Sequence, residues 1–284
     1  MQLNRFWSSV WSVASFLLAV GLLQYIVGGL VGLLGVLPHA ALLLLQLLVV
    51  AVVPVVGALT YVDWRWNWKP EHIGMPRSAA AVWHTLLGVV IGAAASLFAA
   101  VVSGLLSGRG LVLPVVAPPV LTGISVILIV LIVFTAFATE MIFRGAVISR
   151  YQADLSPREV LLAATLTPFG WLIIQGVFRY SALPTGMGTV TEIAMTVCLA
   201  LLFLRTDSVW LSAGLRAGAL VLIALMPGVA TGAGGPVVWG VAAAILLALA
   251  WSRQERMPRR VQPNRGSQRS SRGGRTIRGP WGPH

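Results

Sequence analysis

The chain carries no Asp, Glu, Lys or Arg from residue 6 to residue 62. That stretch is long enough for two membrane-spanning helices, because one helix needs about 20 predominantly apolar residues to cross the hydrocarbon core. The composition agrees, since 57% of the 284 residues are hydrophobic, 10% are charged and the mean hydropathy is +0.88. A soluble domain carries about 25% charged residues. The sequence therefore predicts an integral membrane protein.

Apolar runs bounded by charge, proline or glycine predict an all-α polytopic bundle of about eight transmembrane helices. They are expected near residues 10–37, 40–62, 79–106, 120–143, 159–178, 189–204, 208–226 and 236–251. The first run is too long for the core of a signal peptide, so we expect it to be retained as a span. The chain then divides into N-terminal helices (1–69), a transmembrane core (70–251) and a C-terminal tail (252–284).

The tail differs in composition from the rest of the chain. Residues 253–284 hold nine arginines and one glutamate among glycine, serine and proline, with few apolar residues. Such a segment cannot bury a core, so it is predicted to be disordered. We expect it to contact anionic lipid headgroups. The Arg-Gly pairs also suggest nucleic-acid contacts, but charge runs beside a span usually serve topology, and we do not favour a nucleic-acid partner.

The positive charges are distributed unevenly across the predicted loops. With eight spans, the side that holds both termini would carry most of the basic residues, namely Arg5, Arg65, Lys69, Arg77, Arg144, Arg150, Arg158, Arg205 and the arginines of the tail. The other side would hold only Arg109 and Arg179. Cytoplasmic loops carry the excess of Lys and Arg. We therefore expect a multi-pass protein of the cell membrane with both termini in the cytoplasm.

Cysteine and histidine are scarce. The single cysteine, Cys198, excludes an intrachain disulfide and a cysteine-based metal cluster. The four histidines, His39, His72, His84 and His284, show no HExxH or other metal-ligand spacing. The sequence therefore predicts neither a metal site nor a cofactor.

Three ionisable residues lie in or beside apolar runs. Glu140 and Arg144 are four residues apart at the end of the fourth run, and Arg216 lies in the middle of the seventh. A charge at the centre of a membrane helix costs roughly 2.5–3.5 kcal/mol on insertion scales, so such residues are candidate functional sites. A purely structural interpretation is an i, i+4 pair that stabilises its helix by ~0.2–0.5 kcal/mol. The functional alternative is a polar site in which Glu140 polarises a water molecule.

Three segments resemble the CPBP family, which includes the type II CAAX prenyl endopeptidases and related bacteriocin-processing and immunity proteins. Thr139-Glu140-Met141-Ile142-Phe143-Arg144-Gly145 resembles its Glu-Glu-x-x-x-Arg motif. The segment 204–218 is similar to its third motif region, normally written around His-x-x-x-Asn, and 72–75 resembles a short segment before a long helix. The resemblance covers roughly residues 70 to 225. It implies an intramembrane endopeptidase that acts on membrane-embedded or prenylated peptide segments.

The chain departs from the family pattern at most of the expected site positions. Thr139 stands at the first glutamate, and Arg216 and Leu220 stand at the histidine and asparagine of the third motif. For the intervening Phe-x-x-x-His motif two alignments remain open. Phe169 places Ile173 at the histidine, whereas Trp171 places Gln175 there.

These departures predict weak or lost hydrolysis. The resemblance leaves Glu140, Arg144, Gln175 and Arg216 as candidate catalytic residues, but neither arginine nor glutamine can shuttle a proton at neutral pH. We expect Arg216 to pair with Glu140, since isolated intramembrane charges are rare. Glu192, at the head of the sixth predicted helix, is expected only to favour the helix dipole. The alternative function is a non-catalytic binding or immunity-type protein that uses the same cavity, with an arginine holding a carboxylate, a phosphate or a partner helix.

Overall fold

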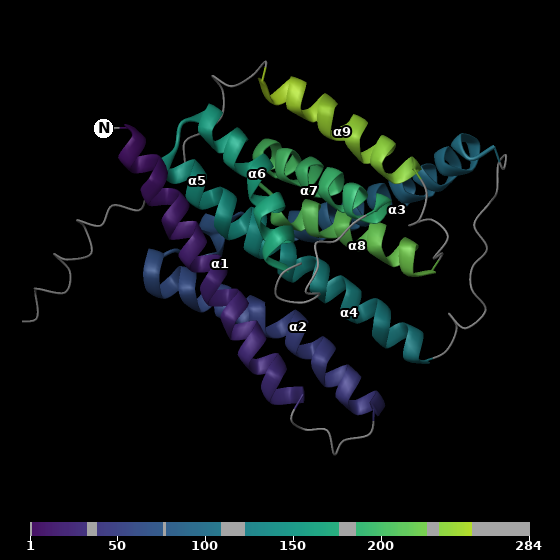
Figure 1. The fold of residues 1–284 in the computed structure, drawn as a ribbon, viewed down its shortest axis with the longest axis horizontal. Helices are drawn as coiled ribbons and strands as arrows, with labels where there is room; N and C mark the ends of the chain where they lie inside the picture. Colours follow the sequence, from purple (N-terminus) through teal and green to yellow (C-terminus); the bar gives the residue numbers. More distant parts are fainter. Residues whose placement is uncertain are drawn as a thin grey trace, which may run out of the picture.

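The computed structural model describes residues 2–32, 39–75, 78–108, 123–175, 186–225 and 233–251. Within these ranges the chain is helical and contains no strand. The α-helices, drawn in Figure 1, are α1 (Gln2–Gly32), α2 (His39–Tyr61), α3 (Ala79–Leu106), α4 (Gly123–Glu140), α5 (Ser149–Asp154), α6 (Pro157–Gln175), α7 (Met187–Thr206), α8 (Val209–Leu225) and α9 (Gly234–Trp251). Shorter π- and 3-10-helical segments are η1 (Val62–Trp66), η2 (Pro70–Ile73) and η4 (Met141–Ile148).

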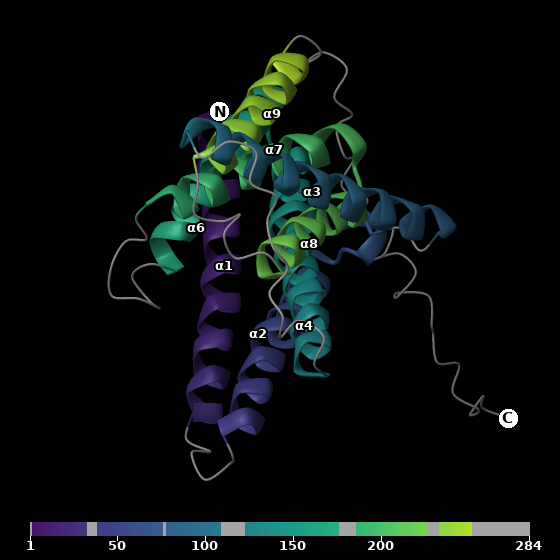
Figure 2. The ribbon, with the colours of Figure 1, turned by 90° about the vertical axis from the view of Figure 1, so that its right-hand side faces the viewer.

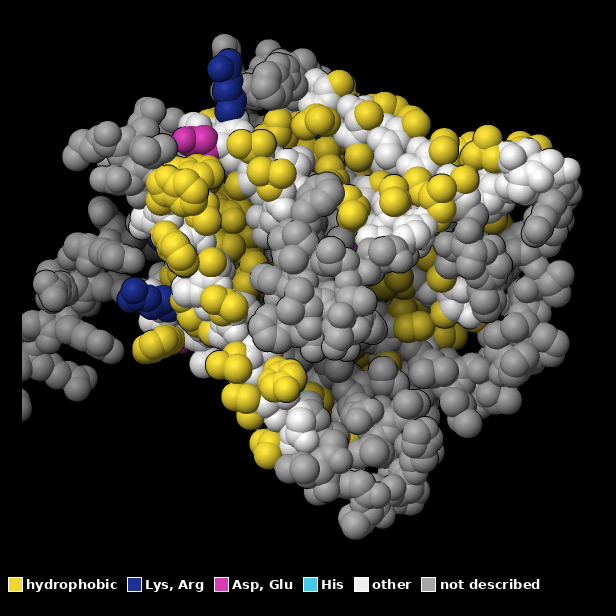
Figure 3. Space-filling model, in the orientation of Figure 1, with side chains coloured by type: hydrophobic (Ala, Val, Ile, Leu, Met, Phe, Trp, Pro, Cys, Tyr) yellow, Lys and Arg dark blue, Asp and Glu magenta, His cyan; other side chains and the backbone are white. Residues whose placement is uncertain are grey.

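This arrangement confirms the predicted all-α bundle. Four helical segments in the described ranges are long and apolar enough to cross a membrane, namely Phe6–Val27, Ala79–Leu106, Ile129–Asp154 and Met187–Thr206. Val209–Leu225 and Gly234–Ala250 are shorter apolar helices. The C-terminal tail lies outside the described residues. The described side chains on the face in Figure 3 are mainly hydrophobic, with the few charged ones towards its left-hand part, as suits a protein surrounded by lipid.

The fourth predicted helix extends further than expected. Its apolar run was predicted to stop at residue 143, but α4 continues through η4 into α5 and reaches Asp154. Charge does not stop the helix here, because Glu140 and Arg144 are both buried and lie within 3.1 Å of each other. Glu140 therefore lies close to the middle of the apolar segment Ile129–Asp154 and not at its end.

Helices α1 and α2 lie side by side (Figure 2). Aromatic rings connect them to the end of the α4–α5 helix. The ring of Phe16 packs on Tyr61 and on Trp66, with centroids 5.2 and 5.3 Å apart. The guanidinium of Arg150, on α5, lies 5.5 Å from the centre of the Trp66 ring, a distance typical of a cation–π contact. This cluster fixes one end of the helix that carries Glu140.

Helices α3 and α8 make the most extensive contact in the bundle, through small residues. On α3 the buried face consists of Gly88, Gly92, Ser96 and Ala99, while large apolar side chains such as Trp83 and Val90 are exposed. Gly214 and Gly218 present the matching face of α8. A methyl group on Gly92 would lie 2.0 Å from the carbonyl oxygen of Leu215, so the two backbones touch. Small residues four apart allow this approach in membranes.

The close approach of α3 and α8 also determines where Arg216 points. Gly214 and Gly218 are four residues apart and lie on one face of α8. Arg216 follows Gly214 by two residues, which turns it by roughly 200° around the helix axis. The side chain of Arg216 therefore leaves α8 on the side opposite α3, towards α4 and α7.

We predict that Gly92→Ala destabilises the protein by about 1–3 kcal/mol, because the added methyl group forces two helix backbones apart. Gly240→Ala in α9 is the matched control, since a methyl group there meets nothing within 4 Å. It should be neutral or stabilising, because alanine is the better helix former. Thermal unfolding of the two variants in the same detergent provides the comparison. Equal melting temperatures would contradict the backbone contact.

Candidate functional site: a buried ion cluster

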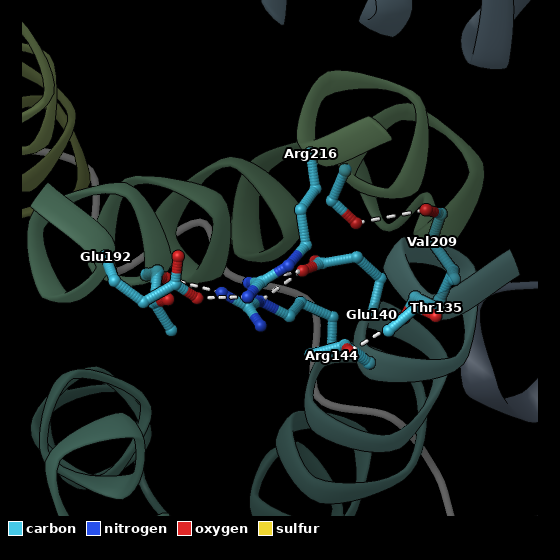
Figure 4. Close-up of polar contacts among 9 residues, drawn as sticks. Thr135, Glu140, Arg144, Glu192, Val209 and Arg216 are labelled. Atoms are coloured by element: carbon cyan, nitrogen blue, oxygen red, sulfur yellow. Dashed lines mark hydrogen bonds and ion pairs between the residues drawn. The ribbon is translucent and has the colours of Figure 1, made fainter. Parts of the chain in front are cut away.

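Four charged side chains meet inside the bundle, from the continuous α4–η4 helix, from α7 and from α8 (Figure 4). Glu140 is the last residue of α4, Arg144 lies in η4, Glu192 in α7 and Arg216 in α8. We call these four residues the ion cluster. Glu140 is fully buried, and 1% of the Arg144 side chain is exposed. The cluster therefore lies in the interior, where each charge needs a partner.

Arg144 connects its own helix to α7. Its Nε atom lies 3.1 Å from Oε2 of Glu140, although the two are not aligned as a hydrogen bond. Its Nη2 atom donates a hydrogen bond of 2.6 Å to the backbone carbonyl of Thr196. Nη1 has no hydrogen-bond partner among the described residues. The π-helical turns of η4, a geometry that is frequent at functional sites, bring this arginine inside the bundle.

Arg216 bridges two carboxylates. Its Nη1 atom donates a hydrogen bond of 3.4 Å to Oε1 of Glu140, so the predicted pairing of these two residues is confirmed. Its Nη2 atom contacts Oε1 of Glu192 on the other side. Figure 4 shows the Arg216 guanidinium between the two carboxylates. Arg216 therefore joins α8 to both α4 and α7.

The prediction for Glu192 was wrong, because this residue is a member of the ion cluster. Helix α7 begins at Met187, so Glu192 lies on its second turn and faces Arg216. A charge count could have found it. Two arginines and one glutamate leave one positive charge unbalanced, and the apolar runs predicted after Glu140 contain two further acidic residues, Glu159 and Glu192. Balancing intramembrane charges would have made Glu192 a candidate partner.

The remaining motif positions contribute less to the described site. The hydroxyl of Thr139, at the position of the first motif glutamate, donates a hydrogen bond of 2.8 Å to the carbonyl of Thr135 in its own helix. Gln175 is the last residue of α6, and its side chain and that of Ile173 lie outside the described residues. The choice between them at the second motif therefore stays a prediction. Among the described residues, no group of three His, Cys, Asp or Glu could hold a metal ion.

The ion cluster is poorly arranged for activating water. Both carboxylate oxygens of Glu140 face guanidinium nitrogens, and the side chain has no exposed surface. The carboxylate therefore offers no exposed oxygen to a water molecule. The accessible edge of the cluster is the other pair, where 30% of the Glu192 side chain and 11% of the Arg216 side chain are exposed.

We predict that Arg216→Met lowers the free energy of unfolding by roughly 3 kcal/mol, because it leaves buried carboxylates without their shared partner. Combining it with Glu140→Gln should recover part of the loss. The double-mutant cycle should give a coupling energy of about 0.5–3 kcal/mol. Arg205→Met, at an exposed arginine near the end of α7, is the control and should show no coupling to Glu140→Gln. Additive shifts for Arg216→Met and Glu140→Gln would count against the ion pair.

Comparison with known families agrees with this placement. Residues 121–222 match the family model described as Type II CAAX prenyl endopeptidase Rce1-like. The matched segment contains all four residues of the ion cluster and covers the later part of the resemblance expected over residues 70–225. No curated protein and no solved structure matches the chain. Residues 121–222 are therefore similar to the family of Type II CAAX prenyl endopeptidase Rce1-like proteins.

Proposed function

We propose that this protein binds a membrane-embedded or prenylated peptide segment in the manner of an intramembrane endopeptidase, and that it hydrolyses the segment weakly or not at all. The family match over residues 121–222 supports the class of ligand. The observation that carries the loss of hydrolysis is the occupation of both Glu140 oxygens by Arg144 and Arg216.

Peptide hydrolysis needs a base that activates water and donors that stabilise the developing oxyanion. The donors are present, because Arg144 and Arg216 together carry several N–H groups. The base is missing, since Glu140 is buried and doubly paired and the Thr139 hydroxyl is bonded to its own helix. Losing one member of a catalytic unit commonly costs several orders of magnitude in rate. The site therefore favours binding over turnover.

The proposed orientation places both termini in the cytoplasm. Arg144 no longer counts as a loop charge, because it is buried in the ion cluster. Arg150 lies near the end of the Ile129–Asp154 segment and Arg158 follows it closely, so the bias in Lys and Arg keeps its sign without Arg144.

We predict that purified full-length protein in lipid does not cleave a fluorogenic prenylated peptide above the rate of its Glu140→Ala variant. A repaired variant should gain activity, because it restores the missing base and proton-transfer groups. The repair combines Thr139→Glu, Arg216→His and Leu220→Asn with histidine at position 173 or 175 in separate variants. The same repair without Thr139→Glu is the matched control and should stay inactive.

Two results would overturn parts of this proposal. Wild-type cleavage that Glu140→Ala abolishes would make the protein a working endopeptidase with unfamiliar catalytic groups. Failure of the prenylated peptide to bind the wild-type protein, measured by equilibrium binding in the same lipid, would remove the proposed ligand class.

A further inference from the structure

The charges of the ion cluster balance only when Glu192 is included. Arg144 and Arg216 contribute two positive charges, and Glu140 and Glu192 contribute two negative ones. The two carboxylates are not equivalent, however. Glu140 is fully buried and held from two sides, whereas Glu192 is 30% exposed and its one ion-pair partner in the described part of the chain is Arg216. Glu192 is therefore the member that can leave with least loss of contact.

The ion cluster also has spare capacity to donate hydrogen bonds. Arg144 Nη1 is buried and has no hydrogen-bond partner among the described residues. An unsatisfied buried donor costs about 1–3 kcal/mol, and more when the group is charged. Figure 4 shows the Arg144 and Arg216 side chains converging on the same region, next to the Glu192 carboxylate. An anionic group that entered there would find an unsatisfied donor as well as a second guanidinium.

We propose that the ion cluster binds one carboxylate carried on an apolar chain, and that this carboxylate replaces Glu192 at Arg216. With Glu192 turned towards the exposed edge, Arg144, Arg216 and Glu140 leave a net charge of +1. One carboxylate restores neutrality, whereas a dianionic phosphate would leave an excess negative charge in a medium of low dielectric constant. The planar guanidinium also suits a carboxylate, which it can hold through two parallel N–H···O bonds.

The apolar chain of the ligand follows from the position of the site. Arg216 lies in the middle of the apolar helix α8, and Val190, which precedes Glu192 on α7 by two residues, has an exposed apolar side chain. A carboxylate reaches that depth only if its own chain is compatible with lipid. A fatty acid and the C-terminus of an apolar peptide both satisfy this condition. Because either would do, the inference does not depend on the proposed function.

The test measures equilibrium binding to full-length protein in nanodiscs, with empty nanodiscs subtracted. One arm compares radiolabelled dodecanoate with methyl dodecanoate, and the other compares an apolar hexapeptide with its C-terminal amide. We expect at least one acid to bind on the order of tenfold more tightly than its neutral analogue, the gain typical of one charge-assisted hydrogen bond. Glu192→Gln should strengthen binding of the acid but not of its neutral analogue, since the Glu192 carboxylate then no longer competes for Arg216.

Two further variants separate this effect from general changes in charge or folding. Glu71→Gln removes an exposed carboxylate in η2 and should leave the affinities unchanged. The double variant Arg216→Gln with Glu192→Gln keeps the cluster neutral, because Glu140 and Arg144 remain paired. It should abolish the preference for the acid, while a retained melting transition shows that it is folded.

Equal affinity for acid and neutral forms in both arms, absence of binding in both arms, or an acid preference that persists in the double variant would overturn the inference. The two arms also distinguish it from the proposed function. Binding of dodecanoate without any peptide binding supports the carboxylate site and counts against a peptide ligand. Equal binding of peptide acid and amide, with no preference for dodecanoate, leaves the peptide function standing and removes the carboxylate site.

Discussion

The structure depends on the need to pair every charge that is buried in an apolar bundle. An arginine or glutamate inside a membrane helix is tolerated only when it finds an opposite charge, a backbone acceptor or water. Arg144 and Arg216 meet this condition through Glu140, Glu192 and the Thr196 carbonyl. These contacts join α4, η4, α7 and α8. These ion pairs offset the cost of burying the charges. They therefore also hold together the part of the fold that carries the candidate site.

Small residues make this pairing possible. Gly88 and Gly92 on α3 face Gly214 and Gly218 on α8 so closely that no side chain fits between the backbones. With α8 held against α3 on that face, its opposite face carries Arg216 towards Glu140. In lipid there is little hydrophobic drive between helices, so close packing and polar contacts provide the association. One side of α8 is therefore held by close packing against α3, and the opposite side by the ion pairs of Arg216.

The ion cluster lies where the chain departs from the motifs that it resembles. Where the family has a glutamate and a histidine, this chain has Thr139 and Arg216. The second substitution adds a positive charge, and Glu192 on α7 balances it. The four side chains together form a neutral ion cluster, and Nη1 of Arg144 has no hydrogen-bond partner among the described residues.

The sequence by itself determined the helical membrane class, most helix positions, the family resemblance and the Glu140–Arg216 pair. These follow from local hydropathy, from motif spacing and from the cost of an unpaired charge. Only the tertiary structure decided that the fourth helix runs on to Asp154, which places Glu140 near the middle of an apolar segment. It also decided that Glu192 completes the ion cluster. A hydropathy pattern predicts that a helix ends at a charged residue. A charged residue that pairs with another helix can instead remain inside the bundle. Only the packed structure shows which residue is its partner.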